Sequence, residues 1–501
     1  LYYRFWTDVK GLSSAFLVGN INKDLWYSVV GLWRIGDFVI LFIPLVLTLM
    51  YVKFFRRMTV GKNQKRNLLI ACVLLFVGSQ CLHTRSVMIW QREIKNELSF
   101  FSAISYRFSQ SQPSNVLTIA WNGYPVYFLK SLGSALKVVT FVKPLTSVDE
   151  TTIQNFIESS PLMDNLPDSV MERNGKKNII LIIVESLNSY ALSVEIDNRP
   201  VTPVLRELIK KRGTLSALNI HTNIKDGRSG DGQLIINTGL YPTVNFSAPV
   251  MLGGRNTFPS LALALKKKEN IAIFGDDASM WNERQTFGNY GFERIISRND
   301  YSDLIVKYGG DGGMFREGLR IIPSLQQPFL IEFLTVSMHL PFNDPYLPKS
   351  KFPQWILDSK SLPEAEKRYL CMVNYFDMEL GNFIKQLVEK GLWEDTMLIL
   401  MSDHPQDMTV KESQIVNGEV MMGMIAANCG VSKEIKRRVE QVDIFTTILN
   451  LSGVNLESGW KGAGISMFND TDRRDERADS ISTLILMTDY FGKVSSHNQT
   501  L

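Results

Sequence analysis

The segment NIILIIV, residues 178–184, decides the fold of the main part of this chain. It is continuously apolar after its first residue and mostly β-branched, which is typical of a central parallel strand buried on both faces. Glu185 and Ser186 follow it directly. Polar groups just beyond the C-terminal end of such a strand lie where open α/β sheets bind their ligands. The segment therefore predicts a fold class and the place of a site.

Three further segments have the pattern of strands and end beside unusual polar residues. They are residues 271–274 before Gly275-Asp276-Asp277, residues 329–335 before Ser337-Met338-His339, and residues 396–401 before Ser402-Asp403-His404. Helical patterns lie between the strands, at residues 203–211, 260–268 and 364–389. This alternation predicts an α/β domain with a mostly parallel central sheet flanked by helices.

A glycine-rich turn carries one hydroxyl group that suits nucleophilic chemistry. Residues 223–242 read NIKDGRSGDGQLIINTGLYP, with Ser229 in the turn and a short helical run at 233–238. Glycines let the backbone approach a ligand closely, and unpaired amides at a helix start favour an anion. Ser229, between Arg228 and Asp231, is placed to attack a phosphorus or sulfur centre. The alternative is an ordinary capped helix start with Ser229 as the N-cap.

The strand ends and this turn supply a donor set for one divalent metal ion. Glu185, Asp403 and His404, together with the Ser229 hydroxyl, offer three oxygens and one nitrogen. Such a set suits Zn²⁺ or Mn²⁺ better than Mg²⁺. A bound ion would lower the pKa of the serine hydroxyl and make it a nucleophile at neutral pH. A single Asp-His pair is also typical of a helix cap with a surface histidine, but two of the five histidines, His339 and His404, follow predicted strand ends.

Composition excludes some partners. The chain has 501 residues, enough for two or three domains, and its formal net charge of +4 is too small to indicate nucleic-acid binding. The four cysteines lie far apart and form no metal-binding pattern.

The chain opens on Leu1 rather than methionine, so we expect a preceding piece with further membrane spans.

Two apolar runs, residues 38–51 and 68–82, are separated by six cationic side chains. We interpret them as a membrane hairpin with a basic cytoplasmic loop, which places the following chain outside the cytoplasm. A buried helical hairpin of a soluble domain is the alternative.

The predicted organisation is a membrane region with two transmembrane helices at 1–82, juxtamembrane helices and a linker at 83–175, the main domain at 176–475 and a C-terminal tail at 476–501.

Short motifs occur in an order that resembles one family. They are VES at 184–186, VTPVLREL at 201–208, RSGDGQ at 228–233, Trp281-Asn282 with GFE at 291–293, SMHLPF at 337–342, YFDMELGNFI at 375–384 and SDH at 402–404. The order is similar to that of the lipoteichoic acid synthase, or phosphoglycerol transferase, branch of the alkaline phosphatase and sulfatase superfamily. The resemblance covers roughly residues 178–469.

The resemblance implies roles for single residues. Glu185, Asp403 and His404 match the family's metal ligands, which usually hold manganese. Ser229 matches the nucleophile, where the lipoteichoic acid synthases carry threonine. His339 matches a substrate-binding histidine that can also pass a proton to the leaving oxygen. Asp276 and Trp281 match positions that line the headgroup pocket.

One departure concerns substrate binding. The family's phosphate-binding arginine comes two residues after the tryptophan, where this chain has Glu283. Arg284 follows and is the expected substitute. The segment PQDMTV after His404 also lacks a glycine common in the family.

The resemblance implies a metal-dependent phosphotransferase with one divalent ion, Mn²⁺ first and Zn²⁺ or Mg²⁺ as alternatives. It would move a phosphoglycerol-type headgroup from a membrane phospholipid, through a covalent Ser229 intermediate, to a glycan or polymer acceptor outside the cytoplasm. The alternatives are a phosphoethanolamine transferase, another phosphodiesterase or sulfatase-family hydrolase, and an inactive relative that binds lipid. The small number of cysteines argues against a phosphoethanolamine transferase. The residues after Ser229 lack the proline and the arginine that sulfatases carry at fixed spacing there, which argues against sulfate ester hydrolysis.

Overall fold

The computed structural model describes residues 61–93, 99–109, 141–159, 166–244, 246–278, 280–301, 309–339, 342, 347, 349–406, 422–454, 459–469 and 474–498. These residues belong to two compact units. The first contains helices α4 (Lys62–Glu93) and α5 (Phe100–Ser109). Helix α4 includes the second predicted apolar run, whereas the first run lies outside the described residues. No helix in the described part of the chain combines the length and the hydropathy needed to cross a membrane.

The second unit is built around a nine-stranded sheet in the order β10-β4-β9-β8-β1-β7-β5-β6, with β11 paired to β4. The strand bounds are β1 (Asn178–Val184), β4 (Leu215–His221), β5 (Glu269–Phe274), β6 (Arg294–Ile296), β7 (Phe329–Leu334), β8 (Thr396–Ser402), β9 (Met422–Ala427), β10 (Lys433–Ile435) and β11 (Val439–Glu440). In this sheet β9 alone is antiparallel to its neighbours, β8 and β4. A small hairpin pairs β2 (Glu195–Ile196) with β3 (Arg199–Pro200).

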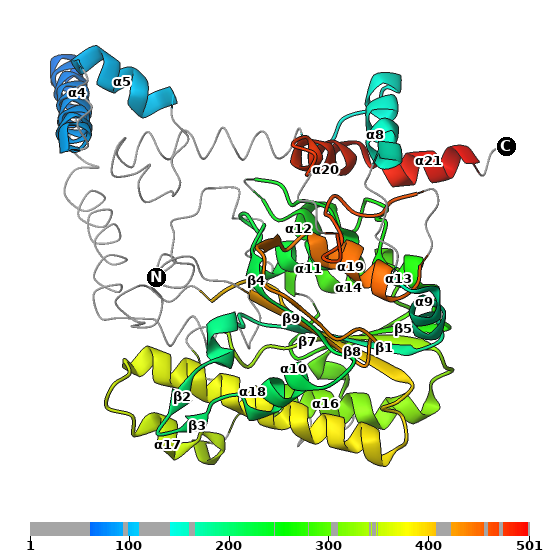
Figure 1. Ribbon diagram of the computed structural model, residues 1–501. Coiled ribbons are helices and arrows are strands. Elements are labelled where there is room, and N and C mark those ends of the chain that lie inside the picture. The colour runs from blue at the N-terminus through cyan, green and yellow to red at the C-terminus, as the bar shows by residue number, and fades with distance from the viewer. Residues whose placement is uncertain are drawn as a thin grey trace. The chain divides into compact units, whose positions relative to one another are not determined.

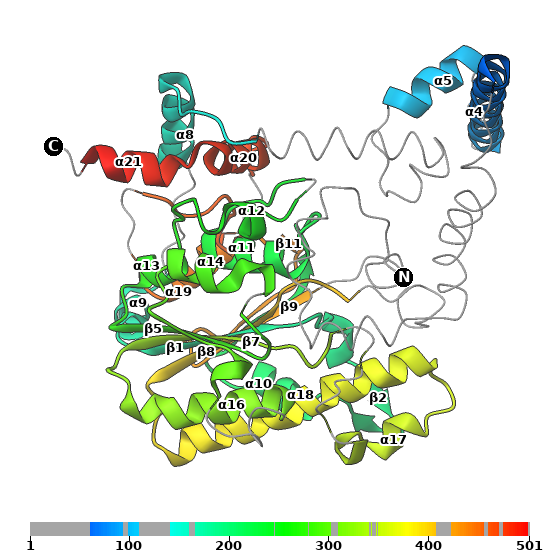
Figure 2. The same cartoon turned by 180° about the vertical axis from the view of Figure 1, so that it is seen from behind.

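Helices cover both faces of the sheet (Figure 1, and from behind in Figure 2). One face carries α10 (Pro203–Lys210), α16 (Gly310–Ile321) and α18 (Glu364–Glu389), with α17 (Gln354–Leu357) against α18. The other face carries α9 (Asp168–Gly175), α11 (Ser229–Thr238), α12 (Ala248–Leu252), α13 (Leu261–Leu265), α14 (Glu283–Asn289) and α19 (Asp443–Leu451). Beyond this second layer lie α8 (Ser147–Ser159), α20 (Ala478–Thr488) and α21 (Tyr490–Asn498).

The predicted fold class, a mostly parallel sheet flanked by helices, is confirmed. The four predicted strands correspond to β1, β5, β7 and β8, and helix α18 has the predicted bounds. The helix predicted at 260–268 is shorter, since the chain leaves it at Lys266 in a left-handed conformation with φ +48°. The sequence predicts only a tail at 476–501, but most of it forms α20 and α21, which bury Ile481, Ile485 and Leu486.

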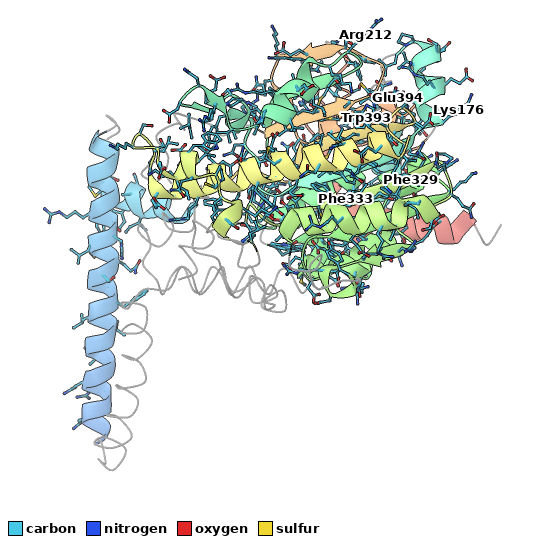
Figure 3. All side chains as sticks on the ribbon, turned by 90° about the horizontal axis from the view of Figure 1, so that it is seen from below. Lys176, Arg212, Phe329, Phe333, Trp393 and Glu394 are labelled. Carbon is cyan, nitrogen blue, oxygen red and sulfur yellow. The ribbon has the colours of Figure 1, made fainter. Side chains whose placement is uncertain are left out.

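Aromatic side chains pack the sheet against the layer of α16 and α18. Phe315 of α16 stacks on Phe383 of α18 with ring centroids 4.9 Å apart, and Phe333 of β7 meets both edge-on. Figure 3 views the molecule from this side and labels Phe329 and Phe333 of β7. Burial of each such ring stabilises the fold by about 2 kcal/mol or more. This layer packs against β7, whose neighbour β1 ends directly before Glu185.

Candidate active site

The parallel pairing of β1 and β8 brings two carboxylates together. Val184 pairs with Ser402 at the ends of these strands, so Glu185 and Asp403 leave the sheet side by side. The Asp403 backbone N–H continues the ladder by donating to the Val184 carbonyl at 3.2 Å. Both side chains are buried. The prediction that these residues meet at the C-terminal edge of the sheet is therefore confirmed by the register.

Ser186 holds the two carboxylates in place. Its backbone has φ +53°, an uncommon conformation for a residue other than glycine. In this conformation its N–H donates to Asp403 Oδ1 at 2.9 Å, while its hydroxyl donates to Glu185 Oε1 at 2.6 Å. Sparsely populated backbone conformations persist where the surrounding structure imposes them, commonly at functional sites.

His404 presents a lone pair to the same cluster. Its Nδ1 lies 2.9 Å from the Pro405 carbonyl oxygen, which can only accept, so the ring proton resides on Nδ1. The Nε2 atom then carries the lone pair, and it lies 3.8 Å from Glu185 Oε1 and 3.6 Å from Asp403 Oδ2. A backbone contact that fixes the tautomer in this way is typical of metal-binding histidines.

Ser229 faces the cluster from the start of α11. Its Oγ atom lies 3.1 Å from His404 Nε2 and 3.4 Å from Glu185 Oε2. Arg228, with φ +49°, occupies the N-cap position, so Ser229 is the first helical residue and not the N-cap. The alternative of an ordinary capping serine is therefore wrong: the hydroxyl is directed at the carboxylate and the imidazole.

Asp231 anchors the turn that presents this hydroxyl. Its fully buried carboxylate accepts hydrogen bonds of 2.9 Å from the N–H groups of Lys225 and Gly227. Two glycines allow the close approach of neighbouring elements. A Cβ at Gly232 would lie 2.2 Å from the Asp403 carbonyl oxygen, and a Cβ at Gly230 would lie 3.1 Å from the Trp281 ring. The start of α11 is thus held directly against the cluster of candidate metal ligands, Glu185, Asp403 and His404.

One ligand atom from each of Glu185, Asp403 and His404 lies within 4.8 Å of the others, which is compatible with a single metal ion. Burial, followed by the charge of Asp403, raises the pKa of Glu185 to about 8. Two buried carboxylates side by side are costly without a cation between them, and a divalent ion at bonds of ~2 Å would offset that cost. The donors are hard oxygens and one imidazole, so this part of the site fits the predicted metal.

The other predicted substrate-binding residues lie around the cluster with differing contacts. Trp281 is buried against Gly230, beside the nucleophile. His339 is half-buried in the turn after β7, at the same edge of the sheet as Glu185. Asp276 forms a partly buried ion pair with Arg298 at 2.9 Å. The Arg284 guanidinium is engaged away from the cluster, with Ser297 and Asp300 at 3.4 and 3.2 Å.

Glu283, in the position of the family's arginine, is buried beneath the site. Its Oε1 accepts from Gln233 Nε2 at 2.7 Å, and burial raises its pKa well above the usual range. Sequence reasoning assigned no role to Gln233 or to Gln441, which donates to the Asp403 carbonyl. Gln233 could have been suspected from its place one turn after Ser229. No local pattern marks Gln441.

A family model described as Sulfatase matches residues 177–454, which include β1, the nucleophile turn and the Asp-His pair. This match covers more than half of the chain. The chain therefore belongs to the sulfatase family.

Within that family the chain is similar to lipoteichoic acid synthases, which confirms the branch inferred from the motif order. Lipoteichoic acid synthase 2 of Bacillus subtilis is 26% identical over 269 residues, covering 52% of this chain and 39% of the relative. A lipoteichoic acid synthase of Staphylococcus saprophyticus is 22% identical over 493 residues, covering 91% and 70%. Several of the curated relatives are thus matched over only half of their length or less.

The fold also agrees with a solved structure. The lipoteichoic acid synthase of Listeria monocytogenes superposes with a TM-score of 0.53 at 18% identity, covering 71% of this chain and 99% of that one. At this identity the likeness concerns the fold.

Proposed function

We propose that this chain is a metal-dependent phosphotransferase that moves a phosphoglycerol-type headgroup from a membrane phospholipid to a hydroxyl of a glycan or polymer. One observation carries the proposal. The Ser229 hydroxyl lies 3.1 Å from His404 Nε2 and 3.4 Å from Glu185 Oε2, within a cluster of metal-type ligands. The similarity to lipoteichoic acid synthases supports the headgroup.

Glu185, Asp403 and His404 would hold one divalent ion, with the Ser229 oxygen as a fourth donor. Mn²⁺ is the first choice, and Zn²⁺ and Mg²⁺ are the alternatives. When bound, such an ion supplies positive charge that favours the alkoxide form of the serine and the added charge on phosphorus. The chain itself contributes the geometry, because Asp231 and Trp281 fix the turn that carries Ser229.

In the first step the Ser229 Oγ forms a bond to phosphorus while the ester bond to diacylglycerol breaks. The Ser229 hydroxyl gives up its proton to solvent before the attack, and the leaving oxygen takes a proton from His339. In the second step an acceptor hydroxyl gives its proton to His339 and attacks phosphorus, and the Ser229 oxygen leaves as the alkoxide. Each step exchanges one P–O bond for another, as expected for a ping-pong transfer. The amides at the start of α11 stabilise the phosphoryl oxygens.

We place the headgroup beside Trp281, with Asp276 and His339 as the expected binding residues. Arg284, which the sequence suggested for this role, pairs with Asp300, and Glu283 accepts a hydrogen bond from Gln233 in the position of the family's arginine. Phosphoethanolamine is the second candidate headgroup, and its transfer is an outcome of the test below.

The donor places the reaction at a membrane. The apolar runs at 38–51 and 68–82 and the basic residues between them motivate a multi-pass protein whose catalytic domain lies on the extracytoplasmic side. A membrane anchor would keep the catalytic domain next to a substrate that resides in the bilayer.

The test is turnover of fluorescent phosphatidylglycerol by the Mn²⁺-loaded full chain in detergent, with phosphatidylethanolamine as the comparison lipid. We expect diacylglycerol release by the wild type, none by Ser229→Ala, and retained activity in Ser229→Thr, since the relatives suggested by the motifs carry threonine there. Mass spectrometry should find the phosphoglycerol adduct on the peptide that contains Ser229. Undiminished turnover by Ser229→Ala would overturn the mechanism, and release from phosphatidylethanolamine alone would change the headgroup.

A further inference from the structure

Gln441 lies outside the sequence motifs of the site, yet its side chain contacts Asp403, one of the candidate metal ligands. The residue is fully buried just after β11, where its backbone N–H donates to the His221 carbonyl of β4 at 2.8 Å. Its side-chain Nε2 donates to the backbone carbonyl oxygen of Asp403 at 2.6 Å. Asp403 is 38 residues earlier in the chain. The contact therefore links two distant segments of the sheet edge.

The other end of the same amide holds the segment that leads to the nucleophile. Gln441 Oε1 accepts from the Thr222 hydroxyl at 3.0 Å and from the Asn223 N–H at 3.1 Å. Asn223 Oδ1 in turn accepts from the Val442 N–H at 3.0 Å. Thr222 and Asn223 follow β4 and precede the turn of Ser229. One side chain thus ties the start of the nucleophile turn to the segment of Asp403 and His404.

The bond to the Asp403 carbonyl acts on the carboxylate through a rigid peptide. The carbonyl oxygen of Asp403 and the N–H of His404 belong to one planar peptide unit. That N–H donates to Asp403 Oδ1 at 2.7 Å. Holding the oxygen end of the plane with Gln441 therefore aims the N–H end at the carboxylate. The same carbonyl also lies close to Gly232 of α11, where an added Cβ would be 2.2 Å from its oxygen.

A partly buried ion pair holds the backbone next to Gln441. The carboxylate of Asp443 accepts from the Glu440 N–H at 3.0 Å and from Arg474 through two bonds of 2.7 and 2.6 Å. A bidentate pair of this kind has a strongly preferred geometry. Gln441 therefore projects from a rigid support, which is what a side chain needs in order to position a neighbouring group.

We infer that Gln441 is a positioning residue that sets the Asp403–His404 peptide plane and the nucleophile turn in one arrangement, so that the metal ligands are correctly oriented before the ion binds. The inference rests on the metal site of the proposed function and not on the transfer reaction. Partners that orient metal ligands typically contribute about 10- to 100-fold to metal affinity.

The experiment measures Mn²⁺ and Zn²⁺ affinity of the full chain by titration calorimetry, together with the melting temperature. Gln441→Met keeps the length of the side chain and removes its hydrogen bonds. Gln441→Glu keeps the acceptor for Asn223 and replaces the donor to Asp403. The control is Asn174→Leu, since Asn174 Nδ2 donates to the carbonyls of Cys429 and Leu451 at 2.8 and 2.9 Å, buried and away from the cluster.

We expect both Gln441 variants to bind each ion at least about tenfold more weakly than the wild type. Asn174→Leu should melt at a lower temperature but retain its affinity within about twofold. The inference is overturned if Gln441→Met binds like the wild type, or if Asn174→Leu loses affinity equally. Should Gln441→Met fail to fold, Gln441→Glu decides by the same criterion. Absence of metal binding by the wild type would instead overturn the proposed function itself.

Discussion

The backbone N–H of Ser186 donates a hydrogen bond of 2.9 Å to Oδ1 of Asp403, across 217 residues of sequence. The bond is possible because Ser186 adopts a positive φ directly after β1. The same residue donates its hydroxyl to Glu185. Ser186 thus contacts both carboxylates of the candidate metal centre and offsets part of their mutual repulsion.

Replacing Ser186 by alanine should weaken metal binding at neutral pH. The backbone bond to Asp403 persists, but Glu185 loses a hydrogen bond that lowers its pKa. The pKa of Glu185 should then rise further, and each unit of that rise costs about tenfold in affinity wherever the ion has to displace the proton. We expect the deficit at pH 7 to shrink at pH 9. Calorimetric titration at both pH values measures it, and an equal deficit at both would contradict this account.

Metal binding by the wild type should release a proton. Burial beside Asp403 raises the pKa of Glu185 to about 8, so below pH 8 the metal-free site carries a proton that the ion must displace. Affinity should therefore increase up to tenfold per pH unit between about pH 6 and 8 and level off above. Titration at pH 7 in two buffers of different ionisation enthalpy measures the proton count, and a count of zero would show that Glu185 is already ionised.

Gly232→Ala should abolish metal binding, whereas Gly288→Ala should not. A Cβ at Gly232 would lie 2.2 Å from the carbonyl oxygen of Asp403, and this backbone atom cannot move without displacing the ligand. Gly288 lies in α14 and a Cβ there meets nothing within 4 Å, so its substitution should be neutral or stabilising by about 0.5 kcal/mol. Calorimetry and thermal melts distinguish the two. Retained affinity in Gly232→Ala would mean that α11 does not confine Asp403.

Glu332→Gln should flatten the pH dependence of stability. Glu332 of β7 is fully buried, Asn237 donates to it at 2.8 Å, and burial raises its pKa to about 8. Between about pH 4.5 and 8 the folded state keeps a proton that the unfolded state loses, so the stability contribution falls as pH rises, by up to about 1.4 kcal/mol per unit. Urea unfolding at pH 5 and pH 8 compares the two proteins. Identical pH slopes would show that Glu332 does not retain its proton.

Local residue patterns accounted for much of the fold. Continuous β-branched runs predicted β1, β5, β7 and β8, because burial on both faces demands apolar side chains at successive positions. Strand β9, with the sequence MGMIAA, was not predicted, since methionine, glycine and alanine carry little strand preference. It forms because β8 and β4 flank it on both sides.

By itself, the sequence determined which elements and functional groups this protein has: buried strands, each followed by carboxylate, hydroxyl or imidazole groups, and a glycine-rich turn with one serine. These features are local, because they depend on the type of side chain at successive positions. Only the tertiary structure decided that Ser229 lies against His404, that Arg284 is engaged with Asp300, and that Gln441 holds Asp403. Distances of this kind depend on strand register and on partners many residues away, which no local pattern encodes.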